Sequence, residues 1–256
     1  MQSFAAKPAT GNKLGRNEPY LTYTRTKPSS IRLLHAWHQK LDDTMSINWN
    51  CGVRLDLLNR LRWNLLDDLD NVKIAWGPHD QTTYLPFFNH PAANESLAEP
   101  PVSHFQVYSQ DCGIKRDMDF GCPEEYEEYR YKLPPNLSIN NEDGRPITLG
   151  QFMTEVHAYL NLPGIMKVIK EIKGAFKGFP VTRKDGSQGK EIIYGRRTRL
   201  PDDAEIFFAW VMATERDKIV TFSISLFLEG EFSLDAEEFW ASRLRKAHEH
   251  EQQRQA

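Results

Sequence analysis

Ten basic side chains between residues 167 and 199 are the strongest candidates for binding chemistry in this sequence. The same window holds only three acids, so it carries a net charge of +7 in a chain whose formal charge is −3. Lysines and arginines at this density can contact successive phosphates of a polyanion. The ten candidates are Lys167, Lys170, Lys173, Lys177, Arg183, Lys184, Lys190, Arg196, Arg197 and Arg199.

The first four of these lysines recur at steps of three and four residues, which predicts one stripe beside the apolar face of a helix. Only Phe179 and Tyr194 could interleave with the charges, so base stacking has little support. The competing interpretation is a solvated helix face whose charges pair with the acidic segments 111–128 or 202–205. We favour this second interpretation because charge runs are usually solvated.

The remaining histidines, cysteines and acids predict no metal site and no cofactor. His35 and His38 have a spacing that can hold a metal on a helix, with Asp42 one turn further on, but ordinary surface positions explain them more simply. Cys112 and Cys122 lack the Cys-x-x-Cys spacing of structural zinc. A solvated helix terminus accounts for the acids Asp67, Asp68 and Asp70.

No catalytic residue is predicted. The sequence holds neither a Gly-x-Ser-x-Gly nucleophile elbow nor a His-Glu-x-x-His metalloprotease motif. Residues 186–190 resemble the end of a phosphate-binding loop, but Lys184 stands where its first glycine should be. Glu191 also replaces the hydroxyl residue that would bind magnesium. This segment therefore predicts a glycine-rich hairpin turn.

Composition and cysteine usage predict an intracellular protein. It has 256 residues, of which 40% are hydrophobic, enough to bury a sizeable core. No apolar run approaches the roughly 20 residues that a membrane helix requires. Three cysteines without a secretory signal indicate free thiols in a reducing compartment. We expect a cytoplasmic or nuclear protein that does not engage membranes, and its oligomeric state stays open.

The first half of the chain predicts few regular elements. Residues 1–28 read as a flexible basic arm, followed by a helix that begins near Ser30. Leucines at near-helical spacing predict a second helix over 53–69, and alternation predicts a strand over 72–76. Residues 77–103 read as a long connection, and residues 105–108 as a short strand. Residues 111–128 carry a net charge of −5 and read as a solvated insertion.

Residues 137–162 carry the clearest local signals. Leu137 and Ile139 indicate a strand, which precedes a capped helix. Thr148 and Gln151 form a capping box, in which each side chain bonds to the backbone of the other, and Ile147 packs on Phe152 as a hydrophobic staple. Pro163-Gly164 is expected to end this helix.

The second half of the chain changes from helical to strand periodicity. A helix with an apolar face is predicted over 165–176, two strands over 206–214 and 218–229, and a charged helix over 234–250. The expected fold is α+β: an antiparallel sheet with helices packed on one side and a flexible N-terminal arm. One domain is predicted over 29–250, with a loop-rich acidic insertion at about 77–130 and a tail at 251–256.

Two segments resemble a known family. The first runs Ala98-Glu-Pro-Pro-Val-Ser-His-Phe-Gln-Val, and the second runs from Asp143-Gly-Arg-Pro-Ile-Thr through the helix to Leu160. In this order they are similar to a family of uncharacterised domains found in mushroom-forming fungi, in which a Pro-Pro-led strand precedes a strand, a turn and a helix. The resemblance covers about a third of the chain and implies a fold, but no activity and no catalytic residues.

These observations favour a non-catalytic intracellular module that binds a protein partner or another ligand, with residues 167–199 as a candidate surface. A nucleic-acid-binding protein is the alternative, in which the same lysines and arginines contact the phosphate backbone without reading sequence. An enzyme whose site is assembled from distant residues, including the 77–103 connection, leaves no local motif and stays a third alternative.

Overall fold

A computed structural model describes residues 52–77, 81–119, 130–176, 179–182, 188–191, 200, 204–216, 219–231 and 234–255. All of these residues belong to one unit, residues 49–256. The arm at 1–28, the helix after Ser30 and the residues His35, His38, Asp42 and Cys122 lie outside the described residues. The predicted domain limits therefore stay predictions.

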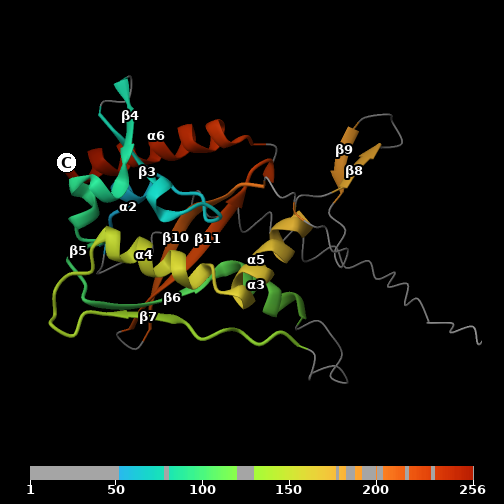
Figure 1. Ribbon diagram of the computed structural model, residues 1–256, viewed down its shortest axis with the longest axis horizontal. Helices are drawn as coiled ribbons and strands as arrows, with labels where there is room; N and C mark the ends of the chain where they lie inside the picture. The colour runs from blue at the N-terminus through green and yellow to red at the C-terminus, as the bar shows by residue number, and fades with distance from the viewer. Residues whose placement is uncertain are drawn as a thin grey trace, which may run out of the picture. The chain divides into compact units, whose positions relative to one another are not determined.

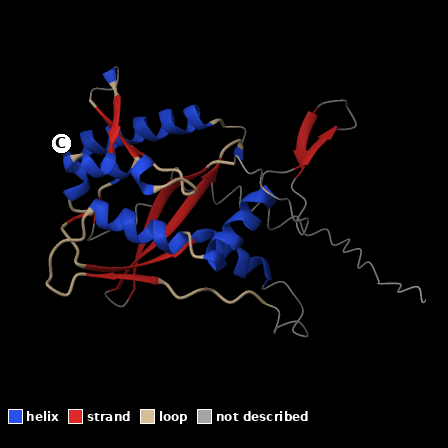
Figure 2. Ribbon diagram, viewed as in Figure 1, coloured by secondary structure: helices blue, strands red, loops and turns tan. Residues whose placement is uncertain are grey.

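A four-stranded sheet forms the centre of this unit (Figures 1 and 2). Antiparallel pairs form on both of its sides, whereas the two middle strands, β11 (Ile219–Leu228) and β6 (His104–Ser109), run parallel, with Thr221 opposite Gln106. The strands predicted near 105, 137, 206 and 218 are confirmed, and with them the α+β class. In spatial order the strands are β10 (Ile206–Arg216), β11 (Ile219–Leu228), β6 (His104–Ser109) and β7 (Leu137–Asn140).

Two helices cover one face of this sheet, as Figure 1 shows: α4 (Leu149–Leu160) and α5 (Pro163–Phe176). A third helix, α3 (Gln110–Asp119), follows β6 directly and contacts α5. Aromatic rings fill the space between the layers. The ring centroid of Phe105 lies 4.5 Å from that of Phe222 and 6.1 Å from that of Phe152. Burial of these side chains supplies much of the driving force for folding.

The C-terminal helix α6 (Ala236–Gln255) packs on the opposite face of β10 and β11, so helices cover both faces there. Side chains alternate between the faces of a strand, and Phe207 and Phe227 point away from α4. Phe227 stacks on Phe239 at 4.2 Å between centroids, and Trp240 closes this smaller cluster. The expected one-sided covering therefore describes α4 and α5 but not α6.

The predicted helix over 53–69 is wrong. Only α2 (Leu55–Leu58) is helical, and the chain then forms β2 (Leu61–Arg62) of a second sheet. Leu61 and Trp63 are both fully buried, so tertiary packing outweighs the helical spacing of the leucines. The sheet is completed by β3 (Lys73–Trp76), which confirms the predicted strand, and by β4 (Thr83–Pro86).

The connection at 77–103 contains short elements rather than open loop. They are β4, the 3₁₀ turns η3 (Phe87–Asn89) and η4 (Pro91–Asn94), and β5 (Ala98–Glu99), which pairs with β1 (Gly52–Val53); a further 3₁₀ turn, η1 (Leu69–Asn71), precedes β3. The turn η4 lies so close to α4 that a Cβ atom on Gly150 would sit 2.9 Å from the carbonyl oxygen of Ala93. This close approach fixes where α4 begins.

The predicted N-cap of α4 is confirmed, because the Thr148 hydroxyl accepts a hydrogen bond from the Gln151 backbone N–H at 3.1 Å. The reciprocal half of the capping box is wrong. The amide of Gln151 instead donates to Asn141 Oδ1 at 2.8 Å and to Glu155 Oε1 at 3.0 Å. The cap therefore stabilises both the helix and its attachment to the end of β7.

Two other local expectations change. Residues 111–119 form most of α3 rather than a solvated insertion, and Asp111 and Cys112 are buried. Pro163 is the first residue of α5, where proline's missing N–H is harmless, whereas α4 already ends at Leu160. The strands β8 (Phe179–Thr182) and β9 (Gln188–Glu191) pair antiparallel, as expected of a hairpin around the glycine-rich segment.

Candidate functional site

The ten basic candidates do not form a single described surface. Lys167 and Lys170 are exposed on α5, but Lys173 is only 5% exposed. Lys173 lies one helical turn beyond the fully buried Ile169 and so falls on the inner face of the helix. The side chain of Lys190 in β9 is not described, and the others lie outside the described residues: Lys177, Arg183, Lys184, Arg196, Arg197 and Arg199.

Lys173 forms a buried charge cluster with two carboxylates from different elements. Its ammonium donates to the carbonyl oxygen of Leu226 in β11 and lies 3.4 Å from Glu231 Oε2 and 3.6 Å from Asp111 Oδ1. Glu231 also accepts a hydrogen bond from the Leu228 N–H at 2.9 Å. The cluster therefore ties α3, α5 and the end of β11 together in the interior.

Burial and mutual charge set the protonation of this cluster. Burial, together with the charge of Glu231, raises the pKa of Asp111 to about 6 although Lys173 acts in the opposite direction. Burial alone would lower the pKa of Lys173, but the charges of Asp111 and Glu231 outweigh it and the pKa is raised. Lys173 is thus a protonated ammonium, which binds anions and cannot attack as an amine nucleophile.

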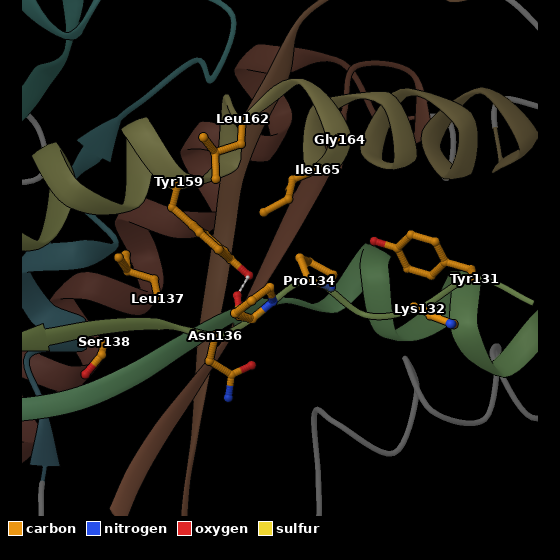
Figure 3. Close-up of a pocket in the computed structure, with 11 residues that line it drawn as sticks. Tyr131, Lys132, Pro134, Asn136, Leu137, Ser138, Tyr159, Leu162, Gly164 and Ile165 are labelled. Atoms are coloured by element: carbon orange, nitrogen blue, oxygen red, sulfur yellow. Dashed lines mark hydrogen bonds between the residues drawn. The ribbon is translucent and has the colours of Figure 1, made fainter.

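A groove of about 580 Å³ opens where the chain before β7 passes the junction of α4 and α5 (Figure 3). Prolines, leucines and tyrosines supply most of its wall, and the Tyr159 hydroxyl donates to the carbonyl oxygen of Pro135 at 3.3 Å. Its lining residues are Tyr131, Lys132, Pro134, Pro135, Asn136, Leu137, Ser138, Tyr159, Leu162, Gly164 and Ile165. Apolar walls with a few polar groups are typical of binding sites.

The ionisable groups near the groove keep their protons. Burial raises the pKa of Tyr159 to about 12. Burial also raises the pKa of Tyr131, and the hydrogen bond that its hydroxyl donates to Cys112 acts in the same direction. Burial likewise raises the pKa of the Cys112 thiol, which is free and 1% exposed. Protonated phenols and thiols donate hydrogen bonds but are poor nucleophiles. The groove is therefore suited to binding rather than to covalent chemistry.

The groove meets the outer edge of the central sheet at Leu137 and Ser138. The Asn141 N–H donates to the Ser103 carbonyl oxygen at 2.8 Å, so Ile139 also faces β6 in the alternating pattern of an antiparallel pair. Ser138 and Asn140 then direct their N–H and C=O groups away from β6. Within the described part of the chain, no other strand pairs with this edge of β7.

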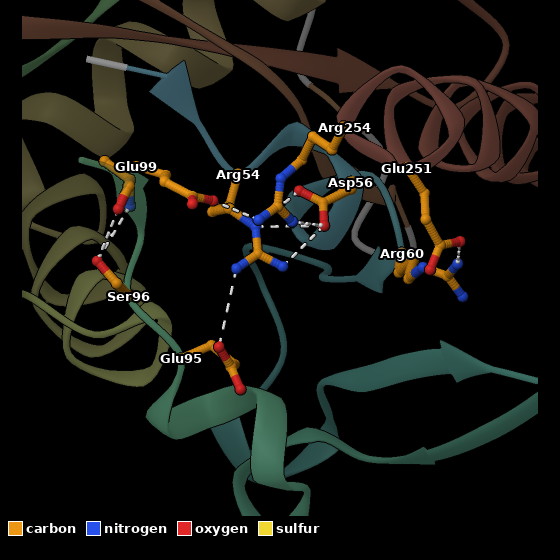
Figure 4. A network of polar contacts seen from close by, with 9 residues as sticks. Arg54, Asp56, Arg60, Glu95, Ser96, Glu99, Glu251 and Arg254 are labelled. Carbon is orange, nitrogen blue, oxygen red and sulfur yellow. Dashed lines mark hydrogen bonds and ion pairs between the residues drawn. The ribbon is translucent and has the colours of Figure 1, made fainter. Parts of the chain in front are cut away.

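A second charged cluster is fully engaged within the protein and offers no comparable site (Figure 4). Asp56 pairs with Arg54 at 2.8 Å and with Arg254 of α6 at 3.0 Å. Burial would raise the pKa of Asp56, but the hydrogen bonds and charges of these arginines outweigh it and the pKa is lowered. Arg60 holds Glu251 at 2.8 Å. These contacts attach the end of α6 to α2 and its neighbours.

Among the described residues, no group of three histidine, cysteine or acidic side chains could hold a metal ion. Asp67, Asp68 and Asp70 are exposed near η1.

Searches of protein-family models, of curated proteins and of solved structures find no match to this chain. None of the helices in the described ranges is long and apolar enough to cross a membrane.

The sequence alone did not predict the groove. Its wall comes from residues 131–138 and from residues 159–165, which are not adjacent in sequence. The only local signal was Pro134-Pro135 ahead of a predicted strand, since prolines hold a chain extended and free of backbone pairing.

Proposed function

We propose that this chain is a non-catalytic protein-interaction module that binds an extended segment of a partner protein. The observation that carries the proposal is the outer edge of β7, whose main-chain groups at Ser138 and Asn140 face outward beside an apolar groove. Extended peptides commonly add to such edges: the backbone supplies affinity, and neighbouring pockets select side chains. We place the module in the cytoplasm or nucleus, in line with its sparse cysteines and the buried free thiol of Cys112.

The test uses the full chain to select binders from a displayed library of random peptides. We expect wild-type protein and Ser138→Ala to enrich the same peptides and Ser138→Pro to lose them. Proline removes the outward N–H and blocks strand addition, yet leaves the bonds from Ile139 and Asn141 to β6 intact. The expected loss is at least about tenfold in affinity, which corresponds to ~1.4 kcal/mol.

Two controls separate binding from folding. Melting temperatures of Ser138→Pro and wild type should agree within about 4 °C, the shift expected for ~1 kcal/mol in a chain of this size. Leu162→Ser should also weaken the selected peptides, because Leu162 lines the groove and is 51% exposed, so its replacement costs little stability. Peptides that bind both variants as well as wild type would contradict the proposal.

Polyanion binding is the second candidate, favoured by the exposure of Lys167 and Lys170 on α5. It predicts retention on heparin that falls steeply with salt and is lost when Arg196, Arg197 and Arg199 are replaced by alanine. A triple variant that elutes at the salt concentration of the wild type would reject these arginines as a phosphate-binding surface.

A further inference from the structure

We infer, on the basis of the proposed function, that the segment bound along β7 is an acidic peptide with apolar residues at alternate positions. Three features of the groove specify it: outward main-chain groups on β7, an apolar wall, and positive charge at its rim. The partner is thus defined by chemistry as an extended chain that carries aspartate or glutamate beside valine, leucine or similar residues.

The positive rim consists of lysines on two sides of the groove. Lys132 is the one charged residue among those that line it, and its side chain is exposed (Figure 3). Lys167 lies one helical turn beyond Gly164, which also lines the groove, and Lys170 lies one turn further along α5. No ion pair within the described ranges involves Lys132, Lys167 or Lys170.

Two described acids close to this surface, Asp119 and Glu171, are already engaged by another cation. Lys115 of α3 lies 3.1 Å from Asp119 and 3.2 Å from Glu171 of α5. Asp119 also accepts the Tyr131 N–H at 3.1 Å. Because these carboxylates have their own partners, neither of them, within the part of the chain that the structure describes, competes with a ligand for the lysines at the rim. Complementary charge at a rim raises the association rate and discriminates against basic peptides.

The apolar requirement follows from strand geometry. A peptide paired with β7 projects successive side chains to opposite faces of the sheet. Every second side chain then lies on the face of Leu137, where Tyr159, Leu162 and Ile165 form the groove wall. The intervening side chains face the other side, so alternation of apolar and polar residues is expected.

The test sequences the peptides that the full chain enriches from the random library and measures one selected peptide by fluorescence polarisation. We expect an excess of Asp and Glu, apolar residues two apart, and weaker binding as salt rises. Lys132→Glu and Lys167→Glu should each weaken binding by about threefold to tenfold. Lys73→Glu makes the same change in charge at an exposed position of β3 outside the groove and should have no effect.

The outcomes distinguish this inference from the proposal on which it rests. Groove-dependent peptides without acidic excess, or unchanged affinity in both charge-reversal variants, would overturn the inference and leave the module itself intact. A library that yields no peptide sensitive to Ser138→Pro would overturn both. If heparin displaces the selected peptides equally from wild type and from both glutamate variants, a polyanion site elsewhere is indicated and the acidic-peptide inference fails.

Discussion

At the scale of single residues, the buried cluster around Lys173 holds two carboxylates and one cation. Lys173 faces both Asp111 and Glu231, and all three side chains are at least 94% buried. The Oδ2 atom of Asp111 is buried and accepts no hydrogen bond among the described residues. A buried carboxylate in this position is most stable with a proton, which explains the direction of its pKa.

This proton makes stability depend on pH in a defined direction. The folded-state pKa of Asp111, about 6, lies above its ordinary value of 3.8. The stabilising contribution is therefore fully present below about pH 4 and is lost as the pH rises through about 6. Relative to Asp111→Asn, which cannot titrate, the unfolding free energy of the wild type should fall by on the order of 2–3 kcal/mol across this window. Urea denaturation at several pH values measures the difference.

Replacement of Lys173 tests whether its charge stabilises the two buried carboxylates. Lys173→Met leaves two buried carboxylates without a cation and should cost about 3–5 kcal/mol at neutral pH. Asp111→Asn leaves the pair of Lys173 and Glu231 intact and should cost far less. Parallel stability curves for wild type and Asp111→Asn between pH 4 and pH 7 would contradict the assignment of the proton to Asp111.

Lys173 also marks the limit of residue-level prediction. Lysines at 167, 170 and 173 share a helical stripe in sequence, yet only the first two are exposed. Three residues turn a helix through about 300°, so each step of three moves the stripe by about 60° around the axis. By Lys173 the stripe has therefore reached the core side of α5, where α3 supplies Asp111. The competing expectation that some of these lysines pair with the 111–128 segment is correct for Lys173.

At the scale of elements, the placement of α4 depends on a glycine in the first turn of the helix. Glycine in a helix costs up to about 1 kcal/mol relative to alanine, so Gly→Ala in a helix is ordinarily neutral or stabilising. Gly150 is different because an added Cβ would lie 2.9 Å from the Ala93 carbonyl oxygen and 3.5 Å from the Ala93 Cβ. The closest of these atoms is the backbone carbonyl oxygen of Ala93 in η4, which cannot rotate away.

Gly150→Ala should therefore destabilise the protein by about 1–3 kcal/mol. In α5, Gly164→Ala is the matched control, because no atom lies within 4 Å of its added Cβ. The control should be neutral or stabilising by up to about 1 kcal/mol. Thermal unfolding of both variants provides the comparison, and a melting temperature for Gly150→Ala at or above that of the wild type would show that η4 moves freely.

Elements were predictable where the signal is local. The cap at Thr148 and the strand predicted over 218–229 need only neighbouring residues, and both are confirmed. The side chain of Gln151 bonds to Asn141 instead of the Thr148 backbone because β7 ends beside it, which the helix sequence alone does not reveal. The helix prediction over 53–69 was wrong for the same reason. Its leucines lie in the short helix α2 and in strand β2, and long-range packing determines their positions.

At the scale of the whole molecule, the fold class followed from periodicity, but the arrangement of the elements did not. The parallel pair of β6 and β11 joins Gln106 to Thr221, and nothing in either strand specifies this partner. The groove could not be predicted from local sequence either, because Lys132 and Ile165 line it together only after α3, α4 and β7 are assembled. Pro134-Pro135 was the single hint, and it indicated extended chain rather than a ligand site.

The position of β11 between β10 and β6 has a consequence for biosynthesis. The ribosome releases β6 and β7 first and must then make α4, α5 and the β8–β9 hairpin before β11 emerges. Through that interval the nascent chain carries Phe105 and Val107 beside an unfilled strand position, where a foreign strand can insert. Chaperones that cover this unoccupied strand position, or slower growth at reduced temperature, should therefore increase the yield of correctly folded protein in a host cell.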